Sequence, residues 1–148
     1  MVEAEAETPA APEPTSEEEI FAAAGFELTD GTWSKCGDPG TASYAPGSIE
    51  RQGDFNGDGH EDALIFEGGT YCFGMTGNGY TLLTNLPDSG WTIIDERIGL
   101  PQFLDTTGTD GWPDIQVGGP GFCFPVIRWN GSEYAVDRNE YEGKPCEM

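Results

Sequence analysis

A stretch of acidic residues and glycines between positions 54 and 62 constrains the fold more than any other part of this sequence. Its first, third, fifth and ninth residues carry side-chain oxygens, and its seventh can offer a backbone carbonyl; these are, in that order, Asp54, Asn56, Asp58, Asp62 and His60. Glycines between them allow the tight coil that makes such oxygens converge. Hard oxygen ligands at this spacing suit Ca²⁺, which accepts several oxygens in a flexible geometry. We therefore predict that these five residues bind calcium.

The chain that follows this loop predicts a β-strand rather than a helix. An EF-hand would place a bidentate glutamate at position 12 of the loop, between two helices. Position 12 is Ile65, within the apolar run 63–66 that is typical of a buried strand. The loop is therefore expected to lead directly into a sheet. The alternative is an acidic turn of the same shape that binds no ion.

A second, less complete copy of the loop follows in residues 105–114, with one inserted residue. The interval from the first loop residue to the next cysteine is the same in both copies, which places Cys72 and Cys123 at equivalent positions. Matching intervals of this length indicate an internal duplication. The second copy has a threonine where the first has its asparagine. Its candidate ligands form either a weaker calcium site or a turn that keeps the shape without the ion: Asp105, Thr107, Asp110 and Asp114.

The pattern D-x-N-G-D-G-x-x-D over residues 54–62 resembles the calcium loop of FG-GAP repeats, the integrin-like (VCBS-type) family of propeller repeats. Residues 117–120, Val-Gly-Gly-Pro, look like the V-G-A-P that follows that loop in the family. The resemblance covers roughly residues 48–136, and the whole arrangement is similar to secreted bacterial proteins built from such repeats. It implies blade-like β-sheets and a bound calcium ion, and it implies no activity.

The sequence as a whole predicts a mainly β, antiparallel fold with one short N-terminal helix. Two repeats, over about 48–99 and 100–140, each supply about four strands, which could stack as propeller blades do or face each other as a sandwich. Glutamates after Ser16 predict a helix over 17–24, with Ser16 as its N-cap. Residues 1–16, rich in Ala, Glu and Pro, are expected to form a disordered linker ahead of a single calcium-binding domain over 17–148.

The net charge of −21 argues against partners that are themselves anionic. Nucleic acids require a basic surface, and so do anionic membranes. No apolar run reaches the ~18 residues of a membrane-spanning helix. We therefore expect neither nucleic-acid binding nor direct insertion into a membrane. Divalent cations and cationic partners would relieve the self-repulsion of such a chain, although solubility or adaptation to salt also accounts for the acidity.

The four cysteines allow three disulfide connectivities. Because Cys72 and Cys123 are repeat equivalents, each is expected to have its own partner, which favours Cys36–Cys72 and Cys123–Cys146. The alternative joins the two repeat cysteines to each other and the outer two to each other. Disulfides and a calcium loop together indicate a periplasmic or secreted protein, and the acidic N-terminus would suit a tether behind a lipid anchor or a leader. Free cysteines in a cytosolic protein are the other interpretation.

No recognisable catalytic constellation is present in the sequence. Its one histidine, His60, lies within the metal loop, so no His-based relay to a nucleophile is available. The acidic pair Asp95 and Glu96 would point to opposite faces of a strand. We therefore expect a non-enzymatic module that binds a protein or glycan through its loops and exposed aromatics such as Trp112 and Tyr44. A small secreted hydrolase, or an inhibitor of a basic hydrolase such as lysozyme, is the alternative.

Overall fold

The N-terminal helix begins earlier than the sequence predicts. The computed structural model describes residues 13–147, and of residues 13–16 only the backbone. Helix α2 spans Glu13–Ala23, so Ser16 lies inside it and is not its N-cap. A proline at position 14 is compatible with this start, because the first turn of a helix leaves its N–H groups unbonded in any case. The expected disordered linker therefore ends at least four residues sooner, and its first twelve residues lie outside the described part of the chain.

Antiparallel β-structure makes up most of the domain, which confirms the predicted fold class. The first sheet joins four strands in chain order: β3 (Ala45–Gly53), β4 (Asp62–Gly68), β5 (Asn78–Leu86) and β6 (Gly90–Ile98). The second sheet joins five in the same way: β7 (Leu100–Thr107), β8 (Pro113–Gly118), β9 (Phe124–Trp129), β10 (Tyr134–Tyr141) and β11 (Lys144–Pro145). A small hairpin of β1 (Glu27–Thr29) and β2 (Thr32–Ser34) follows the helix.

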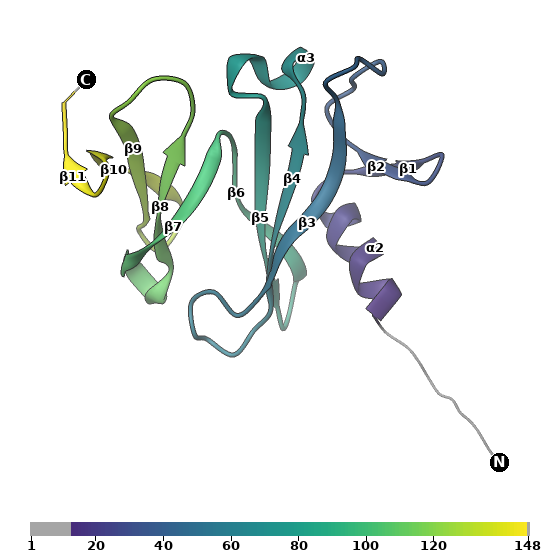
Figure 1. The fold of residues 1–148 in the computed structure, drawn as a ribbon. Helices are drawn as coiled ribbons and strands as arrows, with labels where there is room; N and C mark the ends of the chain where they lie inside the picture. Colours follow the sequence, from purple (N-terminus) through teal and green to yellow (C-terminus); the bar gives the residue numbers. More distant parts are fainter. Residues whose placement is uncertain (1–12, 148) are drawn as a thin grey trace.

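The first sheet lies between helix α2 and the second sheet, so the molecule has three layers (Figure 1). Ile20, Phe21 and Ala24 of the helix pack against one face of the first sheet, at Ala63, Ile65 and Leu83. The opposite face, at Leu64, Tyr80 and Leu82, packs against Ile115, Ile127 and Trp129 of the second sheet. Because both faces of β4 are covered, its apolar residues run without alternation, as the sequence shows over 63–66.

The two sheets stack by unlike faces. In the first sheet, Asp62 and Leu64 point toward the second sheet, since alternate residues share a face. In the second sheet the residues at the matching positions, Asp114 and Gln116, lie on the face turned away, and Ile115 points toward the first sheet. The front of one sheet therefore packs on the back of the next. Of the two arrangements that the sequence allows, this is the head-to-tail stacking of propeller blades and not a sandwich of like faces.

Two disulfides pair as the duplication predicts, Cys36 with Cys72 and Cys123 with Cys146. Cys72 lies in the short helix α3 (Thr70–Phe73) between β4 and β5, and Cys123 lies in the connection between β8 and β9. The first bond ties down the segment before β3, and the second ties down the C-terminal segment. Both bonds indicate an oxidising environment. Within residues 13–147, no helix has the length and apolar character needed to cross a membrane.

Candidate metal centre

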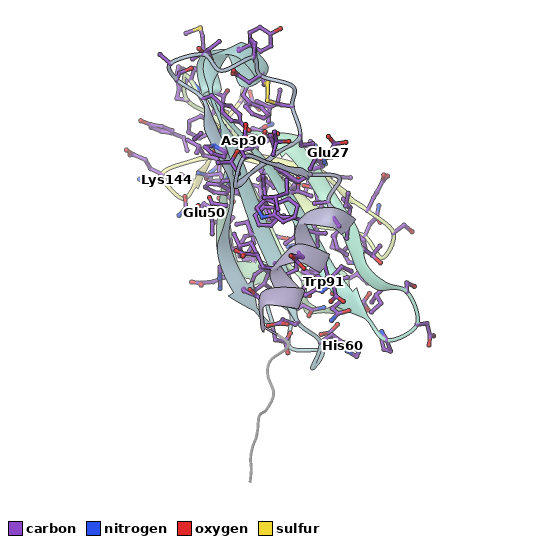
Figure 2. The ribbon with its side chains drawn as sticks, turned by 90° about the vertical axis from the view of Figure 1, so that its right-hand side faces the viewer. Glu27, Asp30, Glu50, His60, Trp91 and Lys144 are labelled. Carbon is purple, nitrogen blue, oxygen red and sulfur yellow. A yellow bond between two sulfur atoms is a disulfide. The ribbon has the colours of Figure 1, made fainter. Side chains whose placement is uncertain are left out.

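The candidate calcium loop joins β3 to β4 at the end of the sheet opposite α3 (Figure 1). The paired residues Gly53 and Asp62 close its base. Phe55 leans onto Phe103 of the second sheet with ring centroids 5.4 Å apart, and the Arg51 guanidinium lies 4.8 Å from the centroid of each ring. Figure 2 shows His60 at the same end of the molecule, with Trp91 above it beside helix α2. The base of the loop is thus fixed to both sheets, and its acidic tip projects beyond them.

Asp54 organises the backbone of the loop. Its Oδ1 accepts hydrogen bonds from the N–H groups of Gly57 and Asp58 at 2.8 and 3.2 Å, and its Oδ2 accepts one from Gly59 at 2.8 Å. These N–H groups, that of Gly59 above all, hold the pKa of Asp54 below its ordinary value. The side chain is therefore a carboxylate at neutral pH. Gly57 and Gly59 both have positive φ angles, 76° and 86°, a conformation that glycine adopts without strain.

Asn56 lies between the two exposed carboxylates of the loop. The amide atom that faces them is 3.1 Å from Oδ1 of Asp54 and 3.1 Å from Oδ1 of Asp58. With nitrogen at that place, the amide donates to both, and its oxygen accepts from Nε1 of Trp112 at 3.3 Å. With oxygen there, three oxygens from alternate residues meet at one point, which is favourable only with a cation among them. Asp54, Asn56 and Asp58 are thus brought together as the sequence predicts.

Asp62, the ninth residue of the loop, is a buried acidic side chain with no basic partner among residues 17–147. Its carboxylate is fully buried, with Oδ2 accepting from the Phe55 N–H at 2.7 Å and Oδ1 from the Thr84 hydroxyl at 2.6 Å. Burial raises the pKa of Asp62, and the nearby charges of Asp58 and Asp54 raise it further. Within residues 17–147, Asp62 forms no ion pair with a lysine or an arginine. A cation bound by the loop would compensate this charge.

The side chains of the first loop provide only some of the oxygen ligands that a hard cation requires. In residues 17–147 no three His, Cys, Asp or Glu side chains lie close enough together to share an ion. At the first loop this is because an amide fills the middle place and Asp62 is turned toward Thr84 and the Phe55 N–H. His60 is half-buried. The loop therefore presents two carboxylates and one amide at a common point, with a third carboxylate behind them.

The second loop does not gather its candidate ligands. Asp105 and Thr107 belong to strand β7 and are exposed, and Asp110 lies in a short 3₁₀ turn with a φ of 61°. Asp114 is fully buried, and its carboxylate accepts hydrogen bonds from Arg128 at 3.0 and 2.9 Å. Arg138 at 3.1 Å and the Thr106 hydroxyl at 2.6 Å complete its contacts. Guanidinium groups thus neutralise the carboxylate that matches Asp62.

The register of the strands explains why the two loops differ. Asp62 is paired with Thr84 across β4 and β5. Ile115 is paired with Ile127 across β8 and β9, so the next position along places Asp114 opposite Arg128. An arginine of the second repeat therefore occupies the place of a threonine in the first. The two residues lie at different distances from their loops along the sequence, so only the strand pairing reveals that they face the aspartates.

Of the two aromatic residues expected to be exposed, Trp112 is buried and Tyr44 is half-buried. Trp112 is 4% exposed and packs in the core between the sheets, beside the first loop. The Tyr44 hydroxyl donates to Oε2 of Glu67 at 2.6 Å. The prediction that Trp112 is exposed is therefore wrong, because the second sheet packs its ring against the first. Exposed aromatics lie instead next to the repeat cysteines, at Tyr71 and Phe122, which are 63% and 70% exposed.

Comparison of the chain with protein-family models, with curated proteins and with solved structures gave no match. The resemblance to FG-GAP repeats therefore rests on the residues of the first loop and of the stretch that follows the second.

Proposed function

We propose that the protein is a calcium-binding module that acts outside the cytoplasm, in the periplasm or as a secreted protein. Asp54, Asn56, Asp58 and Asp62, with the backbone carbonyl of His60, would hold the ion. The observation that carries this proposal is the buried carboxylate of Asp62, which faces other acidic side chains and has no basic partner in the described chain. Its counterpart in the second repeat, Asp114, is instead paired with two arginines, which supports a need for positive charge at this position.

The ion would supply positive charge and nothing more. Asp54 already orders the turn through three backbone N–H groups, so the loop needs little rearrangement to present its oxygens. A divalent cation prefers such oxygen ligands, and it would fix the point at which β3 passes into β4. Because Phe55 joins the loop to the second sheet, the ion would also stabilise the contact between the two sheets.

The module would recognise a protein or glycan partner and would not catalyse a reaction. The likeness of its loop to FG-GAP repeats supports a binding role, and the head-to-tail sheets give a rigid support for one. The exposed aromatics Tyr71 and Phe122 lie beside the disulfides in equivalent connections of the two repeats. They are the surface residues best suited to such contacts, since aromatic side chains are enriched at binding interfaces.

Thermal unfolding of metal-stripped protein tests the proposal. With a dissociation constant of ~10–100 µM, calcium at ~1 mM adds about 1.4–2.7 kcal/mol to the free energy of unfolding. For a domain of this size the melting temperature then rises by about 5–10 °C. Magnesium at the same concentration serves as the control, because it binds poorly where flexible, many-oxygen coordination is required. Identical melting with calcium and with chelator would remove the calcium proposal.

A further inference from the structure

A cavity of about 380 Å³ opens on the helix side of the first sheet, far from the calcium loop. It lies near the Cys36–Cys72 disulfide, and its lining includes two phenylalanines and four charged residues: Phe26, Phe73, Lys35, Glu67, Glu96 and Arg97. Its size falls within the range of about 300–1,000 Å³ that is usual for small-molecule sites. Apolar walls with few polar groups are also typical of such sites.

Glu67 is a buried carboxylate built into the wall of this cavity. It is only 4% exposed. Its Oε2 accepts hydrogen bonds from the N–H of Lys35 at 3.0 Å, from the N–H of Cys36 at 3.3 Å and from the Tyr44 hydroxyl at 2.6 Å. Its Oε1 receives none from residues 17–147. Because Oε1 has no such partner and is not sealed from solvent, it is open to a donor from a ligand in the cavity.

The cavity already holds one ammonium group against an aromatic face. The Lys35 ammonium pairs with Glu96 and lies 5.6 Å from the centroid of the Phe26 ring. This contact shows that acidic and aromatic groups here are placed to receive a cation. The charge of Glu67 also acts on the Lys35 ammonium, but in residues 17–147 that ammonium makes no hydrogen bond to Glu67, so Oε1 of Glu67 stays open to a ligand.

Anions find no free basic group in the same cavity. The Arg97 guanidinium donates to both carboxylate oxygens of Asp95 at 3.1 Å and to the Tyr134 carbonyl at 2.8 Å. Lys35, the other base in the wall, is engaged by Glu96. The charges available in the cavity therefore favour a positive ligand over a negative one.

The Phe73 ring forms a fixed side of the cavity. It lies directly on Gly79 of β5, where a Cβ atom would overlap the ring. The disulfide at the neighbouring Cys72 holds helix α3, which carries this ring. This wall of the cavity is therefore held in place by the packing of the Phe73 ring and by the disulfide.

We infer that this cavity, the Glu67 pocket, binds a small primary amine with an apolar body, through a hydrogen-bonded ion pair between its ammonium group and Oε1 of Glu67. Aromatic rings enclose the body of the ligand. This site does not depend on the proposed calcium loop, which lies at the other end of β4.

Three ligands of one shape and different charge test the inference with unaltered protein. Benzylamine, benzyl alcohol and benzoate are titrated separately, and binding is followed by calorimetry and by NMR shifts of residues that line the pocket. We expect benzylamine to bind about tenfold or more tightly than benzyl alcohol, because a hydrogen bond to a charged group is the stronger one. Benzoate should not bind. Equal binding of benzoate, or no binding of the amine, would overturn the inference.

Substitutions then assign the charge to one residue. Glu67→Gln should weaken benzylamine binding by about tenfold or more, and Glu50→Gln, an exposed change on β3, should leave it unchanged. Lys35→Met should preserve or tighten binding, because it removes the ammonium that competes for the acidic groups. Loss of binding in Lys35→Met would show that the lysine, not the glutamate, recognises the ligand. Melting curves of each variant separate loss of the site from loss of the fold, and the ligand series in the wild type stands without any variant.

Discussion

Arg128 donates two hydrogen bonds to the fully buried carboxylate of Asp114, at the register position where Thr84 faces Asp62 in the first repeat. The two repeats therefore meet the same buried charge by different means. The second provides a permanent cation from its own strand. The first provides the Thr84 hydroxyl and the Phe55 N–H but no positive charge, which the proposed calcium ion would supply. This difference underlies the first two predictions.

Asp58→Ala should abolish most of the calcium-dependent rise in melting temperature. Asp58 stands beside the Asn56 amide at the point where the loop oxygens meet, so its loss removes one of two exposed carboxylates there. Asp110→Ala is the matched control, because Asp110 lies in the equivalent connection of the second repeat but contributes only its backbone carbonyl to the first loop. The measurement is the melting temperature with calcium and with chelator. An equal calcium response in both variants would contradict the assignment of ligands.

Asp114→Asn should lower the free energy of unfolding by about 3 kcal/mol, because it breaks a buried ion pair and leaves two guanidinium groups facing each other. The calcium response should persist, since the first loop is unchanged. Chemical unfolding at neutral pH gives the first quantity, and melting with and without calcium gives the second. A calcium response lost together with the stability would show that Asp114 contributes to the ion site.

The cost of Asp114→Asn should depend on pH. Burial alone would raise the pKa of Asp114, but hydrogen bonds from Arg128, Thr106 and Arg138 outweigh it and hold that pKa below its ordinary value. A lowered pKa in the folded state gives stability that is fully present above the unfolded value, about pH 4, and is lost as pH falls through the folded value. The difference between wild type and variant should therefore be constant from about pH 5 to 8 and shrink below about pH 4. A difference that grows in acid would contradict the ion-pair assignment.

Gly108→Ala should destabilise the second sheet by about 1–3 kcal/mol. A Cβ at Gly108 would lie 2.5 Å from the Trp129 carbonyl oxygen and 2.6 Å from Cγ of Arg128, so the backbone itself would have to move. Gly118→Ala is the control, since its nearest neighbour, the Leu100 carbonyl oxygen, is 3.4 Å away. Urea unfolding of both variants measures the difference. Equal costs would show that the connection before β8 is free to shift.

Removal of the Cys123–Cys146 bond by a double serine substitution should cost roughly 3–4 kcal/mol, since the bond closes a long loop in the unfolded chain. The sequence separation of the two residues is 23. The strands β10 and β11 should become more open to hydrogen exchange, while the first sheet stays protected. Exchange measured by mass spectrometry tests this. Uniform loss of protection would show that the two sheets unfold only as one unit.

The sequence predicts those features of the fold that depend on local pattern and on duplication. The first loop ends in a strand because apolar residues follow Asp62 without a helical period. The disulfides follow from the equivalence of Cys72 and Cys123, which needs no knowledge of distance. Both inferences depend only on the order and spacing of residues along the chain, which folding does not change.

Features that depend on contacts between distant segments could not be predicted in this way. Trp112 stands between Gly111 and Pro113 in a stretch that is typical of a turn, yet the packing of one sheet on the other buries it. Arg128 becomes the partner of Asp114 only once β8 and β9 are paired in their observed register. The Glu67 pocket is lined by Phe26, Phe73 and Glu96, which come from three separate segments of the chain. The residue pattern within a single segment gives no information on which distant segments it contacts.

The two sheets pack head to tail, with the front of one on the back of the other. Such an interface is not self-complementary, so it leaves a free face on each side of the pair. Another unit of the same kind could be added at the outer face of the second sheet without a new type of interface. There the chain places Gln116 and Arg128 where the first sheet has Leu64 and Thr84, and helix α2 covers the other end. In the described residues, one outer face of the pair of sheets thus carries polar side chains and the other is covered by helix α2. Exchanging Gln116 for leucine, its counterpart in the first sheet, would make this outer face more apolar and is expected to favour association through it.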